Sequence, residues 1–187
     1  MANWREKMWL KNYLSDEALM RAYASSDQDA FTQLYERHKR SLYYFILRQT
    51  NRQSVCEELV HDVWLAVIRQ SAHYQNTAKF KTWLFRIAHN RLVDYWRRQK
   101  HRSKLIVVDE LDELAVAQCE IDESLRLKEL SGCLEQLSTE QLSTMLLKVE
   151  GFSYAEISDI TKTKKETVKS RLRYATKNLK LSLEAVL

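Results

Sequence analysis

Residues Gly151–Leu179, GFSYAEISDITKTKKETVKSRLRYATKNL, predict two helices joined by a tight turn. Ser153 is placed to cap a short helix, YAEISDIT, and Lys162–Lys164 provides a brief polar turn after it. The apolar residues that follow recur at helical spacing, at Val168, Leu172, Ala175 and Leu179. A short helix, a tight turn and a longer basic helix predict a helix-turn-helix. An ordinary helical hairpin is the alternative.

The second helix of such a motif would place its N-terminal end in the major groove of DNA. Arginine and lysine can donate to guanine or to phosphate, glutamate can accept from cytosine, and hydroxyl groups can reach either. The candidate residues are Lys164, Lys165, Glu166, Thr167, Lys169, Ser170, Arg171 and Arg173.

A second basic stretch, Phe80–Lys104, reads FKTWLFRIAHNRLVDYWRRQKHRSK. We expect its apolar face to consist of Trp83, Ile87, Val93 and Trp96. Asp94 is the single acid among eight cations, and so one-sided a charge favours a polyanionic partner. Aromatic rings beside a cationic groove can stack on unpaired bases, each worth roughly 1–3 kcal/mol. The alternatives are a core role for Trp83 and Ile87 and a basic face that is only solvated.

The composition favours an all-α protein. The chain of 187 residues has no proline and only two glycines, which leaves few helix breakers and turn formers. Three cysteines and five histidines lie in no metal-binding pattern, so we expect free thiols, a reducing cytosol, and neither metal nor cofactor. The sequence contains no signal peptide and no apolar run of about 18 residues.

The charge pattern indicates two small helical domains. Leu105–Glu123 carries seven acids and no base, and we interpret it as an acidic linker between domains at residues 1–104 and 124–187. In the first domain, VCEELVHDVWLAVIRQ predicts a helix with Val55, Leu59, Val63 and Val67 on one face. Its acids Glu58 and Asp62, with His61, lie on another side and suggest a basic partner. Ordinary surface acids are the alternative reading.

Taken together, these motifs resemble a bacterial RNA polymerase sigma factor of the extracytoplasmic-function (ECF) group. The resemblance covers about residues 15–104 and 125–181. The matching segments are DAFTQLYERH, CEELVHDVWLAV, FKTWLFRIAHNRLVDYWRR and EGFSYAEISDI followed by ETVKSRLRYATKNL.

The resemblance implies a transcription initiation factor without enzymatic activity that works in the cytoplasm. It would bind core RNA polymerase, through the clamp of the largest subunit and the flap region, and would recognise the −35 and −10 promoter elements and aid −10 melting. An anti-sigma factor would hold it inactive, and no small-molecule substrate is implied. The acidic linker would pass near the RNA path.

The resemblance also implies individual roles. The residues that would face the polymerase clamp are Glu58, Leu59, His61, Asp62 and Trp64. The residues that would contact the −10 element are Tyr74, Asn76, Lys79, Lys81, Arg86, Asn90, Arg91, Arg97 and Arg98. Among them, the loop Tyr74–Lys79 and Asn90 would capture a flipped base, and the arginines would hold phosphates.

Five positions depart from the family pattern. Ser138 stands where the family often has proline, and Leu142 stands where an arginine is usual. In the helix-turn-helix turn, Lys162 replaces the usual glycine, between Thr161 and Thr163 instead of aliphatic residues.

Two other classes of protein remain open. A conventional helix-turn-helix regulator would bind duplex DNA tightly without polymerase. A nucleic-acid enzyme would need clustered carboxylates or a metal site beside its basic groove, whereas Asp94 stands alone among cations and no catalytic triad or phosphate loop occurs.

Overall fold

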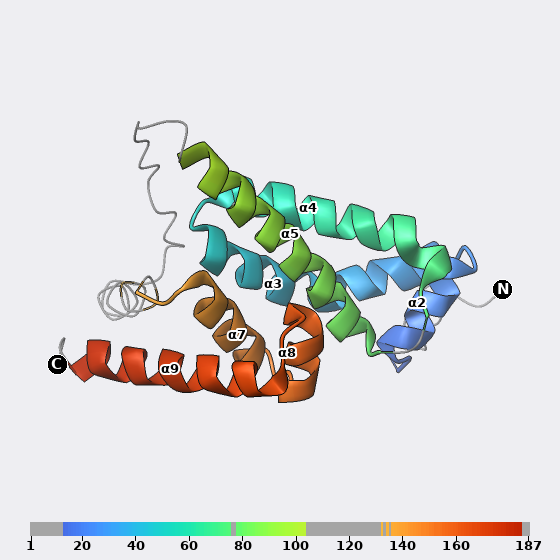
Figure 1. Ribbon diagram of the computed structural model, residues 1–187. Helices are drawn as coiled ribbons and strands as arrows, with labels where there is room; N and C mark the ends of the chain where they lie inside the picture. The colour runs from blue at the N-terminus through green and yellow to red at the C-terminus, as the bar shows by residue number, and fades with distance from the viewer. Residues whose placement is uncertain (1–12, 76–77, 104–131, 133, 135, 185–187) are drawn as a thin grey trace, which may run out of the picture. The chain divides into compact units, whose positions relative to one another are not determined.

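The computed structural model describes residues 13–75, 78–103, 132, 134 and 136–184, and every regular element among them is helical (Figure 1). The chain divides into two compact units. The first comprises residues 1–47 and 54–108, and the second comprises residues 48–53 and 109–187. The linker predicted at 105–123 lies outside the described residues.

The first unit contains four α-helices and one short 3-10 helix. In chain order these are α2 (Asp16–Ala24), α3 (Gln28–Thr50, whose last residues group with the second unit), α4 (Gln53–Gln70), η1 (Ser71–His73) and α5 (Phe80–Ser103). The ring of Phe45 on α3 packs 5.1 Å from that of Phe85 on α5, and Phe31 packs 5.8 Å from Trp64 on α4. Helix α3 therefore carries packing contacts to both α4 and α5.

The buried face of α5 differs from the predicted one. Its fully buried side chains are those of Phe80, Leu84, Phe85, Ala88 and Leu92. Of the predicted stripe, only Ile87 is buried; Trp83 and Trp96 are half-buried, and Val93 is 42% exposed. The residues at i, i+4, i+8 and i+12 from Phe80 form the core face, so the two tryptophans flank it.

The carboxylate of Asp16 attaches α2 to α3. Ser15 caps this helix by accepting a hydrogen bond from the Ala18 N–H. Asp16 then accepts hydrogen bonds from Arg37 Nη1 at 2.8 Å and shares one with His38 Nε2 at 2.7 Å, and both partners are on α3. Burial favours a raised pKa for Asp16, but these two hydrogen bonds outweigh it and leave the pKa below 3.8.

The second unit contains α7 (Thr139–Val149), α8 (Tyr154–Thr161) and α9 (Lys165–Glu184), which pack against one another (Figure 1). Ser138 and Ser153 each form a capping box, with Gln141 and Glu156 respectively. Ser138 thus begins α7 with a side-chain cap where the family often has proline. The buried residues of this unit include Leu147, Ile157, Ile160, Val168 and Ala175.

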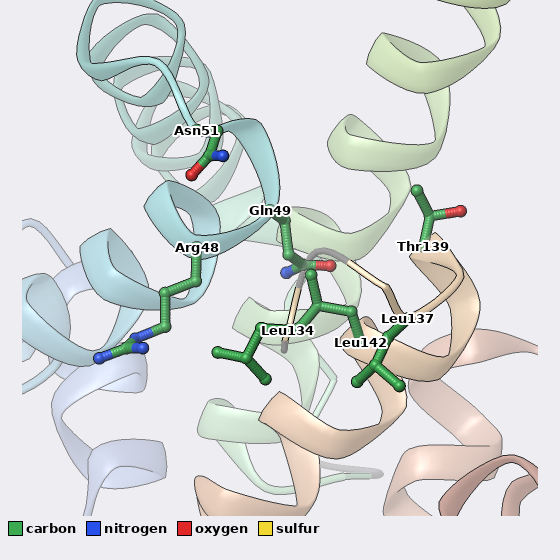
Figure 2. Close-up of a pocket in the computed structure, with 7 residues that line it drawn as sticks. All are labelled: Arg48, Gln49, Asn51, Leu134, Leu137, Thr139 and Leu142. Carbon is green, nitrogen blue, oxygen red and sulfur yellow. The ribbon is translucent and has the colours of Figure 1, made fainter. Parts of the chain in front are cut away.

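Leu142, the other departure in α7, contributes an apolar side chain to a hollow in the second unit. Figure 2 shows this hollow, whose lining residues are Arg48, Gln49, Asn51, Leu134, Leu137, Thr139 and Leu142. Leu137 is buried, while Leu134 and Leu142 are half-buried. The arginine usual at position 142 would place a charge in this leucine-rich lining.

The turn between α8 and α9 adopts the left-handed conformation without a glycine. Lys162 has φ 52° and ψ 40°, a region that disfavours residues with a Cβ atom. The flanking hydroxyl groups support this backbone. Thr161 Oγ1 donates to the Ile157 carbonyl at 2.7 Å and lies 2.9 Å from Thr163 Oγ1, and Ser158 Oγ donates to the Thr163 carbonyl. The two threonines therefore hold a standard tight turn that the sequence alone left in question.

Replacing Lys162 by glycine should stabilise the protein by about 0.5–1 kcal/mol. The substitution removes the strain of a residue with a Cβ atom in the left-handed conformation, which stabilises the folded state. The greater conformational freedom of glycine in the unfolded chain offsets part of this stabilisation. Denaturant unfolding measures it, with Lys164→Gly as the control, because Lys164 has no positive φ and should gain nothing. Equal effects of the two substitutions would contradict the role of strain at Lys162.

Asp16→Asn should destabilise the protein by about 1–2 kcal/mol at pH 7, because it weakens charge-assisted hydrogen bonds to α3. The pKa of Asp16 is lowered in the folded state. Its contribution is therefore present above the ordinary value of 3.8 and is lost as pH falls toward the folded pKa. Unfolding curves of both proteins across this range should converge at low pH. A constant difference would argue against an ionised Asp16.

Candidate nucleic-acid interface

The segment before α5 is held by an aromatic cluster. The Tyr74 hydroxyl donates to the Ala78 carbonyl at 3.2 Å, and its ring meets Trp83 edge-on with centroids 5.1 Å apart. Burial raises the pKa of Tyr74 to about 12, so the hydroxyl stays protonated and remains a donor. Of the other predicted residues here, Lys79 is exposed and Asn76 lies outside the described residues.

A hollow on α5 collects several of the predicted −10 residues. It is lined by Gln70, Trp83, Arg86, Ile87, Asn90 and Arg91. The buried Nε–H of Arg86 has no hydrogen-bond partner among the described residues. A half-buried indole, two guanidinium groups and two amides can together stack on a base and bind its edge or its phosphate. Gln70 is an addition to the predicted set, since only the packing of α4 beside α5 brings it here.

The cations toward the end of α5 are exposed and partly compensated by the helix's own acid. Arg97 Nη2 forms an ion pair with Asp94 Oδ1 at 2.7 Å, and Arg98 Nε donates to the Asp94 carbonyl. Near the start of the helix, Lys81 is half-buried and its ammonium lies 5.7 Å from the Phe85 ring. The exposed Arg97 and Arg98 therefore present charge to solvent, with Asp94 as a weak competitor for any phosphate.

The acidic face of α4 contains fewer surface residues than predicted. Glu58 and His61 are exposed and Asp62 is half-buried, whereas Leu59 and Trp64 are only 4% and 5% exposed. The Trp64 ring packs against Phe31 and Tyr35 of α3. Leu59 and Trp64 thus belong to the core of the free protein, and their contact with the polymerase stays a prediction. Tyr35, at the surface beside Trp64, was not among the predicted residues.

Helix α9 presents most of its predicted residues to solvent. Lys164, Lys165, Glu166, Lys169 and Arg173 are exposed, while Thr167, Ser170 and Arg171 are half-buried. Glu166 and Lys169 form an exposed ion pair at 3.0 Å.

Arg173 and Arg171, two of these predicted residues, also interact with other parts of the protein. The Arg173 guanidinium lies 5.2 Å from the ring of Tyr174, which is 50% exposed and was not predicted. The pKa of Glu140 at the start of α7 is lowered, chiefly by a hydrogen bond from its own backbone and in smaller part by the charge of Arg171. The charge of Arg171 therefore acts on the start of α7, a helix that packs against α9.

The described residues hold no group of three or more histidine, cysteine or acidic side chains able to bind a metal. Within the same part of the chain, no helix is long and apolar enough to cross a membrane.

Comparison with known proteins assigns both basic helices to recognised modules. Residues 34–102 match Sigma-70 region 2, and residues 127–179 match Sigma-70 region 4. The class of protein is therefore an RNA polymerase sigma factor, a transcription initiation factor that directs polymerase to promoters. Relatives that match over most of their length identify the group of sigma factors.

The chain is 30% identical over 172 residues to the "ECF RNA polymerase sigma factor SigK" of Mycobacterium sp. (strain KMS), with 88% of each chain covered. It is 32% identical over 140 residues to the "RNA polymerase sigma factor CarQ" of Myxococcus xanthus, covering 74% of this chain and 80% of that one. The protein belongs to the ECF group of sigma factors. The family, the all-helical fold and the promoter-directing function predicted from the sequence are thereby confirmed, and a conventional regulator is not favoured.

Solved structures agree on the fold. CnrH, solved in complex with the cytosolic domain of CnrY, superposes with a TM-score of 0.70 at 23% identity and covers 91% of this chain and 97% of that one. The sigma factor RpoE from Bartonella quintana, solved with the anti-sigma factor NepR, superposes with a TM-score of 0.68 at 23% identity and covers 82% of this chain and 96% of that one.

Replacing Asp94 by asparagine should strengthen promoter binding by the polymerase holoenzyme roughly two- to fivefold at low salt. The substitution removes the acid that competes with phosphate for Arg97, and it should steepen the salt dependence by about one ion. Binding titrations over a salt series measure both effects. Glu36→Gln, at an exposed acid on α3, is the matched control and should change neither. Weaker binding by the Asp94 variant would show instead that the ion pair orients Arg97 for its contact.

Proposed function

We propose that the chain reads a bipartite promoter with its two basic helices, α5 at the −10 element and α9 at the −35 element. The observation that carries this proposal is that most of each basic helix lies within one of the two sigma regions matched. The proposed domains are residues 1–104 for polymerase and −10 binding, an acidic linker at 105–123, and residues 124–187 for −35 binding.

At the −10 element, the hollow on α5 would receive a base or phosphate of the unpaired strand. Unstacking a base costs a few kcal/mol, which stacking and hydrogen bonds at the site must offset. Trp83 supplies a ring, Asn90 an amide, and Arg86 an Nε–H without a partner among the described residues. Exposed Arg97 and Arg98 would hold phosphates, while Tyr74, Asn76, Lys79 and Lys81 belong to the proposed entry side.

At the −35 element, the N-terminal turns of α9 would enter the major groove. Lys164, Lys165, Lys169 and Arg173 are exposed and cationic, and Glu166 is paired with Lys169 in the free protein. In the complex, phosphate would draw Lys169 away from Glu166 and leave the carboxylate able to accept from a cytosine amino group. Thr167 and Ser170 are half-buried and would contribute shorter-range contacts.

Polymerase binding is proposed for the exposed side of α4. Glu58, His61 and Asp62 form an acidic surface there that suits a basic site on the clamp of the largest subunit, and Leu59 and Trp64 fix the helix from the core side. The second unit would meet the flap region.

We further propose regulation by an anti-sigma factor. RpoE was solved with the anti-sigma factor NepR, and CnrH was solved with the cytosolic domain of CnrY. The chain is proposed to act in the cytoplasm, where bacterial polymerase works, and to have no catalytic activity of its own.

The test is transcription in vitro with sigma-free core polymerase on a library of promoter fragments. Discrete start sites that depend on the protein support the proposal and reveal both elements. Strong footprints by the protein alone, without transcripts, would favour a regulator.

Separate substitutions should divide the two roles. Lys165→Ala, Lys169→Ala and Arg171→Ala together should weaken −35-dependent promoter binding by at least roughly tenfold and leave core binding nearly unchanged, because they remove cations facing DNA. Glu58→Ala with Asp62→Ala should do the reverse, since these acids lie on α4. Core affinity by fluorescence anisotropy and promoter affinity of the assembled holoenzyme measure the two roles. Parallel loss of both activities in either variant would refute the division.

A further inference from the structure

Helix α2 lies ahead of the matched Sigma-70 region 2 segment and packs against both elements that flank the segment before α5. The match begins at residue 34, whereas α2 spans Asp16–Ala24. Its packing partners include η1, which ends at His73, and α5, which begins at Phe80. A helix outside the matched region thus supports both sides of the segment proposed to handle the −10 element.

Glu17 makes the contact at the start of α5. Its Oε1 accepts a hydrogen bond from the Phe80 backbone N–H at 2.9 Å, across 63 positions of sequence. Burial favours a raised pKa for Glu17, but hydrogen bonds, that from Phe80 foremost, outweigh it and lower the pKa. Glu17 is therefore ionised at neutral pH.

The contact compensates for a missing feature of α5. The first N–H groups of a helix lack intrahelical partners, and the positive end of the helix dipole favours an acid nearby. The first turn of α5 has no acid, and Lys81 adds a cation there. Glu17 supplies from α2 the negative charge and the acceptor that α5 lacks in its own sequence.

Phe80 links this hydrogen bond to the proposed −10 surface. Its ring is fully buried, lies 5.9 Å from Trp83 and 6.2 Å from Tyr74, and Tyr74 in turn donates to the Ala78 carbonyl. Trp83 also lines the hollow with Arg86 and Asn90. A shift of the Phe80 backbone would therefore move the ring of Trp83 and the residues just before α5 together.

We propose that Glu17 is a positioning residue that fixes the start of α5 and so sets how sharply the protein discriminates −10 sequences. This inference rests on the proposed role of α5. Helix α2 stays attached without Glu17, because Asp16 holds Arg37 and His38, and Leu19 and Met20 are fully buried. Loss of Glu17 thus loosens the helix start while leaving the fold in place.

The test compares Glu17→Met with Glu36→Met, which removes an exposed acid on α3 paired with Lys39. Holoenzymes would be assayed on the cognate promoter and on a panel with single base substitutions in the −10 element or in the −35 element. Glu17→Met should reduce the ratio of cognate to −10-substituted transcription roughly three- to tenfold, consistent with one charge-assisted hydrogen bond. The −35 ratios and core affinity should stay unchanged. Glu17→Gln retains a carbonyl acceptor and should restore part of the −10 ratio.

The alternative outcomes separate the inference from the function on which it rests. Unchanged −10 ratios in Glu17→Met, while Asn90→Ala lowers them, would overturn the role of Glu17 and leave the role of α5 intact. Equal decreases in −10 ratios, −35 ratios and core affinity would show that Glu17 is only structural. Indifference of the wild-type protein to every −10 substitution would refute the proposed function itself.

Discussion

The first unit depends on the burial of one ring, Phe80, at the first residue of α5. Three other elements contact Phe80. The ring of His38 on α3 lies 5.4 Å from the Phe80 ring, and that of Tyr74, before α5, lies 6.2 Å from it. The backbone N–H of Phe80 donates a hydrogen bond to Glu17 on α2. A fully buried aromatic side chain loses much hydrophobic free energy if it moves toward water. Packing of Phe80 and its hydrogen bond to Glu17 therefore act together at the start of α5, and the rotation of the helix determines which residues face outward.

That rotation determines how a strongly cationic helix can be stable. The core stripe from Phe80 to Leu92 leaves Arg97 and Arg98 exposed to solvent, where water and salt screen their mutual repulsion, and leaves Arg86 and Arg91 half-buried. Asp94 relieves part of the repulsion near Arg97, as Glu166 does for Lys169 on α9. In each helix an acid three residues before a cation lowers the local charge in the free protein. Such exposed pairs are weak, so phosphate can displace them at low cost.

Features encoded locally were predictable from the sequence, and features that depend on tertiary packing were not. The caps at Ser138 and Ser153 and the helix-turn-helix follow from residues within a few positions of one another. The face of α5 was misjudged because tryptophan satisfies a hydrophobic pattern whether it lies in the core or at its edge. The burial of Leu59 and Trp64 could not be deduced from the family motif that named them. Nothing near Glu17 in the sequence indicates its bond to Phe80.

The turn of the helix-turn-helix shows that a departure in sequence need not be a departure in geometry. Lys162 occupies the left-handed conformation that glycine adopts most readily, and hydroxyl groups of Ser158, Thr161 and Thr163 provide hydrogen bonds that aliphatic neighbours cannot. After this turn α9 begins at Lys165, and Lys165, Lys169 and Arg173 lie on its exposed side. If α9 reads the −35 element as proposed, a difference in preference from other family members should arise from its side chains, including Tyr174, which was not predicted and lies beside Arg173, and not from an altered turn.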